Sequence, residues 1–260
     1  MHTIVLATQK GGSGKSTLAI GLALAAQQSG HIVRLVETDQ QGTLSHWQSR
    51  RGLAEPLVET LYRADDIEQR LQALERGGVT LAIIDTAGGQ SAATTAAIRY
   101  ADLCVIPARP SVADIEASAA TLTIIRAWKK PFAFVLNQTP TRGQRTDKAA
   151  SAIGDELTLS IADVLARPFV AMRCDHQDAL RAGLAVSEYA PSGKSADEIR
   201  ELWRWVEARL NDGMASEAKP INEWQFGKSA VATQAHVESK PPPLSDSAWG
   251  DGNASWDACL

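Results

Sequence analysis

Short apolar runs alternate with stretches of helical periodicity over the first 210 residues of the chain. Runs of this length that are rich in Ile, Val and Leu are typical of strands buried on both faces of a sheet. The segments between them are long enough to hold helices. The pattern therefore predicts an α/β fold, with a mostly parallel, twisted sheet and helices on both faces. The predicted strands are Ile4–Ala7, Ile32–Val36, Val79–Ile84, Leu103–Ile106 and Phe132–Leu136, with one more near Ala166–Val170.

A helical stripe closes this part of the chain. Its apolar residues are Ile199, Leu202, Trp203, Val206 and Leu210, a spacing that predicts an amphipathic helix. Such a stripe is typical of the last core helix of a domain, although a helix lying on a membrane surface has the same pattern. The sequence alone favours the core helix.

From Asn211 onward the composition changes, and no sustained periodicity remains. Small and acidic residues dominate, and Lys240 is followed by three prolines, a composition that predicts disorder. We therefore divide the chain into a domain at residues 1–210 and a tail at residues 211–260. The tail carries four aromatic residues, which fit either a partner-binding peptide or a loose tail: Trp224, Phe226, Trp249 and Trp256.

Composition narrows the functional classes only a little. The formal net charge is −4, and the tail alone holds 3 Lys/Arg against 7 Asp/Glu, so the domain is nearly neutral and neither requires nor excludes nucleic acid. The apolar runs are shorter than the ~20 residues of a membrane span, and residues 1–8 lack a secretion signal, which predicts a cytoplasmic protein. Cys104, Cys174 and Cys259 are far apart, so we expect neither a disulfide nor a metal cluster.

Candidate chemistry begins directly after the first predicted strand. A glycine-rich loop there joins the strand to a predicted helix, with the sequence Lys10-Gly11-Gly12-Ser13-Gly14-Lys15-Ser16-Thr17. Glycines let the backbone turn tightly with its N–H groups pointing inward, and the helix adds its positive N-terminal end. Such a loop binds a polyphosphate, with Lys15 on the β- and γ-phosphates and the Ser16 hydroxyl on Mg²⁺. It deviates from the usual P-loop, because Gln9 replaces the first glycine and Lys10 adds a second lysine.

Two other predicted strands run into carboxylates. Asp39 follows the strand Ile32–Val36, and Asp85 follows the strand Val79–Ile84. Ligands of parallel α/β sheets bind at the carboxyl ends of the strands, so both residues are expected beside the phosphate loop. Mg²⁺ prefers oxygen ligands in octahedral geometry, which Asp85, the Ser16 hydroxyl and phosphate oxygens supply together. The pair Gly88-Gly89 then provides a hinge near the γ-phosphate.

The loop with two lysines resembles the ParA/MinD family of ATPases, whose deviant Walker A motif reads K-G-G-x-G-K-[ST]-T. The resemblance covers about residues 1–210 and is strongest to the small plasmid-partition branch. It implies ATP and Mg²⁺ as cofactors, hydrolysis of ATP to ADP and phosphate, and a homodimer that forms on ATP binding. In the family the first lysine, here Lys10, reaches the nucleotide of the partner subunit across a two-fold interface.

The resemblance also implies a role for Asp39. The family usually reads D-x-D-P-Q-G-N where this chain has Glu37-Thr38-Asp39-Gln40-Gln41-Gly42-Thr43, and its second aspartate orients the attacking water. Asp39 is by this resemblance the hydrolytic residue, with Lys10 and Lys15 as the other catalytic groups. Three positions depart from the pattern, and the loss of the proline at position 40 frees a φ angle. The alternative is that Asp39 only caps the following helix.

Two further segments leave their roles open. Pro107-Ala108-Arg109-Pro110-Ser111-Val112-Ala113-Asp114 resembles a family segment that leads into a helix at the dimer interface, here expected from Asp114 to Trp128. Ser111 or Asp114 either caps that helix or takes part in chemistry, and capping is favoured. Asn137 follows the strand Phe132–Leu136 at the position where related ATPases contact the adenine ring, although asparagine is also a common turn residue.

By resemblance, the function is to partition or position DNA or another cargo. An ATP-bound dimer of this type binds non-specific DNA, is released on hydrolysis, and is stimulated by a ParB-like or adaptor protein. The implied location is cytoplasmic and nucleoid-associated, without stable membrane insertion. Two alternatives remain: a metabolic ATP-dependent ligase or synthetase of the same fold, and a MinD-like positioning switch at a membrane or protein surface.

DNA binding of this kind depends on basic residues that contact phosphates. Candidates occur throughout residues 141–210, but acidic residues are interspersed among them, so no basic patch is apparent in one dimension. The candidates are Arg142, Arg145, Lys148, Arg167, Arg173, Arg181, Lys194, Arg200, Arg204 and Arg209.

Overall fold

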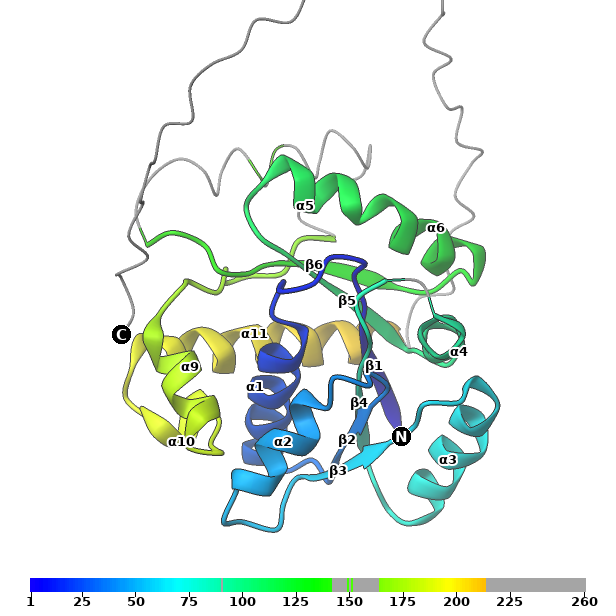
Figure 1. The fold of residues 1–260 in the computed structure, drawn as a ribbon, viewed down its shortest axis with the longest axis horizontal. Helices are drawn as coiled ribbons and strands as arrows, with labels where there is room; N and C mark the ends of the chain where they lie inside the picture. The colour runs from blue at the N-terminus through cyan, green and yellow to red at the C-terminus, as the bar shows by residue number, and fades with distance from the viewer. Residues whose placement is uncertain (90, 142–148, 150, 152–163, 214–260) are drawn as a thin grey trace, which may run out of the picture. The chain divides into compact units, whose positions relative to one another are not determined.

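The computed structural model describes residues 1–89, 91–141, 149, 151 and 164–213. At its centre is a parallel sheet with the strand order β3-β2-β4-β1-β5-β6 (Figure 1). The strands are β1 (His2–Leu6), β2 (Val33–Glu37), β3 (Leu57–Thr60), β4 (Leu81–Asp85), β5 (Leu103–Ala108) and β6 (Phe132–Leu136). The predicted α/β class and the parallel sheet are confirmed.

Helices cover both faces of this sheet (Figure 1). One face carries α1 (Lys15–Gln28), α2 (Thr43–Arg50), α9 (Cys174–Arg181), α10 (Val186–Tyr189) and α11 (Lys194–Gly213). The other carries α3 (Ala64–Arg76), α4 (Ala92–Arg99), α5 (Val112–Ala117) and α6 (Ala119–Ala127). Successive side chains of a strand point to opposite faces, so Ile4 and Leu6 enter one core and Val5 the other. Burial on both faces is the reason why these strands read as continuous apolar runs.

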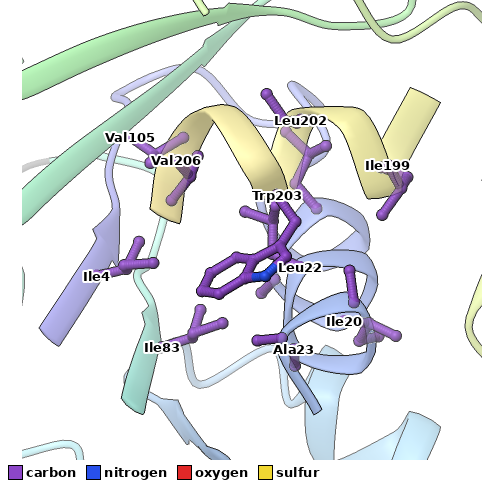
Figure 2. Close-up of a cluster of buried hydrophobic side chains, with 14 of the residues drawn as sticks. Ile4, Ile20, Leu22, Ala23, Ile83, Val105, Ile199, Leu202, Trp203 and Val206 are labelled. Atoms are coloured by element: carbon purple, nitrogen blue, oxygen red, sulfur yellow. The ribbon is translucent and has the colours of Figure 1, made fainter. Parts of the chain in front are cut away.

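The stripe on α11 belongs to the core. Ile199, Leu202, Trp203, Val206 and Leu210 are all buried, and Trp203 lies in one cluster with side chains of α1 and of the sheet (Figure 2). The Trp203 indole N–H donates to the Ser29 hydroxyl at 3.0 Å. Gly21 permits the close approach of α1 to α11, because a Cβ there would lie 3.2 Å from Cγ2 of Ile199. The preference for a core helix over a membrane-surface helix is confirmed.

Two expectations about strands are wrong. The sequence does not predict β3, because this edge strand is only partly covered and shows no apolar run. Conversely, no strand forms near Ala166–Val170, where the chain makes only single bridges, Phe134 with Leu165 and Thr139 with Ala171. A lone bridge on each side of a bend does not build a ladder, although the segment still packs beside β6.

The helix expected from Asp114 to Trp128 is also wrong, because two helices, α5 and α6, meet at Ser118. Ser118 is fully buried, and its hydroxyl donates to the Asp114 carbonyl at 2.9 Å. Its N–H donates to the carbonyl of Ile115, three residues back, at 3.0 Å. Side-chain bonding to the preceding turn competes with regular α-helical bonding and accounts for the break.

The last helix of the described part of the chain ends slightly beyond residue 210. Helix α11 continues to Gly213, three residues past residue 210. Residues 214–260 of the predicted tail, with its aromatic residues, lie outside the described residues, so the division at 210 and the nature of the tail stay predictions. Within the described part of the chain, no helix combines the length and the apolar character needed to cross a membrane.

Candidate functional site

The loop between β1 and α1 has the backbone shape that an anion site requires. Gly12 (φ 73°) and Gly14 (φ 90°) adopt left-handed conformations that glycine tolerates best. Gly14 precedes α1 and supplies no side chain to cap it, so the first N–H groups of the helix stay available. Free N–H groups at the positive end of a helix attract a phosphate.

Lys15, the first residue of α1, lies in the floor of this loop. Its side chain is almost fully buried, and burial lowers the pKa of its amine, while the charges of Asp85 and Asp39 act in the opposite direction. The Lys15 amine is therefore desolvated near two carboxylates before any ligand arrives. The arrangement fits the predicted contact of Lys15 with a phosphate oxygen.

Ser16 and Asp85 form the candidate Mg²⁺ ligands. The Ser16 hydroxyl donates to Oδ2 of Asp85 at 2.6 Å, while the buried Oδ1 of Asp85 has no hydrogen-bond partner among the described residues. Burial raises the pKa of Asp85 to about 7. Bonding to Ser16 and the charge of Lys15 oppose this shift, and the charges of Asp39 and Glu37 add to it. An unpaired carboxylate oxygen beside a hydroxyl fits the oxygen donor set that Mg²⁺ prefers.

The raised pKa of Asp85 predicts a pH-dependent metal affinity. Asp85 must lose its proton to bind Mg²⁺, and a pKa of about 7 leaves it mostly protonated at pH 6 and mostly ionised at pH 8. We expect the affinity for Mg·ADP, measured by calorimetry in saturating Mg²⁺, to fall about tenfold from pH 8 to pH 6. ADP binding in excess EDTA is the control. An equal pH dependence with and without Mg²⁺ would contradict this assignment.

Asp39 lies in the half-buried loop between β2 and α2. Its Oδ1 accepts a bond from the Gln41 N–H at 3.0 Å, so its carboxylate does not cap α2 as the alternative interpretation required. The adjacent Thr38 donates to the Asp85 carbonyl through its N–H at 2.9 Å and its hydroxyl at 3.2 Å. The structure therefore joins the ends of β2 and β4, with Asp39 near both Lys15 and Asp85. The water-orienting role of Asp39 stays a prediction.

Two amide side chains after β6 hold the phosphate loop from outside. Asn137 Nδ2 donates to the Ser13 carbonyl at 2.8 Å, and Gln138 Nε2 donates to the Gly12 carbonyl at 2.9 Å. A Cβ on Gly14 would lie 2.2 Å from Asn137 Nδ2, which leaves room only for glycine. The C=O and N–H groups of a planar peptide point in opposite directions. Because the Gly12 and Ser13 carbonyls are held outward, the N–H groups of the same two peptides point toward the phosphate site. The contact of Gln138 with the phosphate loop was not predicted from the sequence. The predicted contact of Asn137 with adenine stays a prediction.

The extra lysine of the loop is paired with Asp114. Lys10 Nζ lies 3.4 Å from Asp114 Oδ1, and Arg109 binds the same carboxylate through Nε at 2.7 Å and Nη2 at 3.1 Å. Burial alone raises the pKa of Asp114, but the bonds from Arg109 and Lys10 outweigh it and lower that pKa. Ser111 caps α5 by accepting the Asp114 N–H at 3.2 Å. The favoured capping role thus belongs to Ser111, and sequence reasoning missed Arg109.

The candidate DNA-contacting residues differ in whether they form ion pairs with acidic residues. Arg173, Arg181 and Arg200 each pair with a nearby acidic residue, while Arg142, Arg145 and Lys148 lie outside the described residues. Arg167 and Arg204 have no ion pair with any described residue. They line an open groove of about 610 Å³ between the segment after β6 and α11, together with Pro168, Phe169, Glu201 and Trp205.

Fold and site together define a class of protein. A parallel sheet, a phosphate loop with two lysines, and a Ser–Asp pair beneath it are the parts of a P-loop nucleotide-binding protein with a deviant Walker A motif. The family described as VirC1 protein matches residues 1–148, more than half of the chain. The chain belongs to this family and, with it, to the ParA/MinD/Soj group of partition and positioning ATPases.

Individual relatives are similar at modest identity. "Maintenance of carboxysome distribution protein A" of Halothiobacillus neapolitanus is 28% identical over 208 residues, a match that covers 77% of this chain and 94% of that protein. Protein ParA of Rhizobium radiobacter is 30% identical over 129 residues, which cover 48% of this chain and 56% of that protein.

Solved structures share the fold. Apo McdA from Cyanothece has a TM-score of 0.65 at 18% identity, covering 81% of this chain and 99% of that one. MinD of Pyrococcus horikoshii with Mg-ADP has a TM-score of 0.63 at 15% identity, covering 82% and 98%. A cobyrinic acid a,c-diamide synthase of Mycobacterium smegmatis, with an ATP analogue and magnesium, also reaches 0.63 at 15% identity, covering 82% and 96%. The fold alone therefore does not separate positioning ATPases from metabolic enzymes.

Proposed function

We propose that this protein is a Mg²⁺-dependent ATPase that dimerises on ATP binding and positions a cargo in the cell. The observation that carries the proposal is the Ser16–Asp85 pair beneath the phosphate loop, in which the buried Oδ1 of Asp85 has no hydrogen-bond partner among the residues that the structure describes. Lys15 and Asp39 lie at the same site, and a second lysine lies at its rim. The Mg-ADP complex of MinD, which has the same fold, supports the choice of nucleotide.

In the proposed cycle, two ATP-bound protomers close face to face, and each Lys10 reaches the nucleotide of the other. Lys10 must then leave Asp114, a buried carboxylate that needs a cationic partner. Arg109 remains bound to Asp114 through two nitrogen atoms. Because Asp114 keeps this partner, release of the half-exposed Lys10 costs little free energy.

Hydrolysis follows from the groups assembled at the closed site. Asp39 orients the attacking water, and Lys15 and the partner's Lys10 neutralise negative charge that spreads over the γ-phosphoryl oxygens. Ser16 and Asp85 hold Mg²⁺, which supplies further positive charge there. A monomer lacks the second lysine, so we propose that it hydrolyses ATP slowly and that ATP hydrolysis separates the dimer.

For the surface that the ATP-bound dimer binds, we propose non-specific duplex DNA, which contacts the groove of Arg167 and Arg204. Neither guanidinium group pairs with an acidic residue in the part of the chain that the structure describes, so both can contact backbone phosphates. Arg167 also stacks on Phe169 at 3.9 Å from the ring centroid, which restricts its motion. A surface that reads only phosphates suits a protein that must bind DNA of any sequence.

Purified Asp39→Ala protein tests this function, because it should bind ATP without hydrolysing it. We expect it to be dimeric by light scattering in Mg·ATP and monomeric in Mg·ADP. In an electrophoretic mobility assay, duplex DNA of arbitrary sequence should shift with Mg·ATP only, and less so as salt is raised. A protein that stays monomeric in saturating Mg·ATP would refute ATP-driven dimerisation.

A matched pair of double variants locates the DNA surface. Arg167→Ala/Arg204→Ala in the Asp39→Ala background should weaken the shift about tenfold or more and reduce the salt slope by about two. Arg181→Ala/Arg200→Ala removes the same charge from arginines that already pair with acidic neighbours and should change the shift much less. Equal losses in both variants would argue against the groove. A dimer that shifts no DNA would instead indicate that the dimer binds a protein or membrane surface.

A further inference from the structure

Glu37, the last residue of β2, has a fully buried carboxylate, and every described residue that donates a hydrogen bond to it lies on the next helix. Oε1 accepts the Leu44 N–H at 2.6 Å, and Oε2 accepts the Ser45 N–H at 3.3 Å. The Ser45 hydroxyl donates a further, short bond to Oε2. A carboxylate in the core needs such donors, and the first turn of α2 supplies them.

These bonds replace a missing helix cap. Helix α2 begins at Thr43, and the residue before it is Gly42, which has no side chain to accept from the free N–H groups of the first turn. Leu44 and Ser45 are the second and third residues of the helix, which are the donors that a capping side chain normally satisfies. Glu37 therefore caps α2 from the neighbouring strand, and its negative charge suits the positive end of the helix.

The cap also controls the loop that carries Asp39. Residues 38–42 run from the backbone of Glu37 to the turn that the Glu37 side chain holds, so one residue restrains both ends of the loop. Gln40 stands at the position where a proline would restrict φ, so the chain has no covalent restraint there. An aspartate at position 37 would be shorter by one carbon–carbon bond of about 1.5 Å, too short to keep the contact with the Leu44 N–H.

We propose that Glu37 is a positioning residue for hydrolysis, which holds Asp39 in place by capping α2 from the end of β2. The inference rests on the proposed ATPase function, and it assigns to Glu37 a task distinct from nucleotide binding. Displacing a group at the reacting centre by about 1 Å can lower a rate by up to about 10²-fold. The predicted signature is therefore a loss in kcat without a matching loss in nucleotide affinity.

Two substitutions of Glu37 test its reach and its acceptors. Glu37→Asp should lower kcat about tenfold or more and leave the Kd for Mg·ADP within about threefold. Glu37→Gln keeps the length and one acceptor oxygen, so its loss should be smaller. By hydrogen exchange, the amides of Leu44 and Ser45 should exchange about fivefold faster in Glu37→Asp, as expected for a lost cap. A larger loss in Glu37→Gln than in Glu37→Asp would overturn the argument from reach.

A second pair of variants keeps the test valid if changes at the buried Glu37 prevent folding. Ser45→Ala removes one donor to Glu37, whereas Ser49→Ala removes a hydroxyl whose one bond among the described residues is to the His46 carbonyl on the same helix. We expect Ser45→Ala to lower kcat severalfold and Ser49→Ala to leave it unchanged. Unchanged kcat in Ser45→Ala and in folded Glu37→Asp would overturn the inference, even if the amides exchange faster. Absence of hydrolysis by the unmodified protein would instead refute the proposed function, while amide exchange would still report on the cap.

Discussion

Lys10→Ala should lower the ATP turnover of the protein by about 10³-fold or more, with nucleotide affinity within about threefold of the unmodified protein. A cation supplied to the γ-phosphoryl group by a partner subunit has an effect of this size in related phosphoryl transfers. Affinity should survive because the Lys10 side chain pairs with Asp114 and is therefore not engaged in binding the phosphates of its own subunit. The measurements are steady-state hydrolysis and calorimetric titration with Mg·ADP.

Mixing two inactive variants shows whether Lys10 acts on its own nucleotide or on the partner's. In a dimer of Lys10→Ala with Asp39→Ala, the first protomer keeps Asp39 and receives Lys10 from the second, so one site is complete. If protomers are mixed before ATP is added, half of the dimers are mixed, and about a quarter of the normal activity should return. If Lys10 acts on its own nucleotide, neither site is complete and the mixture stays inactive.

Lys15→Ala should abolish nucleotide binding, with an affinity for Mg·ADP that falls about 10²-fold or more. Lys15 is the buried cation of the phosphate loop and lies near the carboxylates of Asp85 and Asp39. Its loss would leave these carboxylates, which repel a phosphate, without the positive charge that offsets them. Calorimetric titration measures the loss, and a melting curve without nucleotide checks that the variant is folded.

Lys10→Ala is the matched control for this experiment, because both substitutions remove one lysine from the same loop. The two variants should separate binding from turnover: Lys15→Ala loses both, and Lys10→Ala loses turnover alone. Binding by Lys15→Ala within about tenfold of the unmodified protein would mean that the backbone N–H groups of the loop carry most of the phosphate affinity. The assigned role of Lys15 would then be wrong.

The sequence by itself determined the features that depend on contiguous residues. Burial on both faces makes a strand a continuous apolar run, so the parallel sheet can be predicted from β1, β2, β4, β5 and the well-covered edge strand β6. The phosphate loop can be read because its glycines and lysines have their effect within one short stretch of backbone. Strand β3 was not predicted, because this partly exposed edge strand has neither a continuous apolar run nor a recognisable motif.

Only the tertiary structure decided which distant groups meet at the site. Asp114 receives Lys10 across more than 100 residues, and Asn137 and Gln138 reach the phosphate loop across a similar separation. These contacts follow from the strand order, which places β5 and β6 beside β1 and brings their carboxyl ends to one edge of the sheet. Local sequence cannot show them, because an exposed arginine or a turn asparagine has the same pattern whether or not the fold gives it a partner.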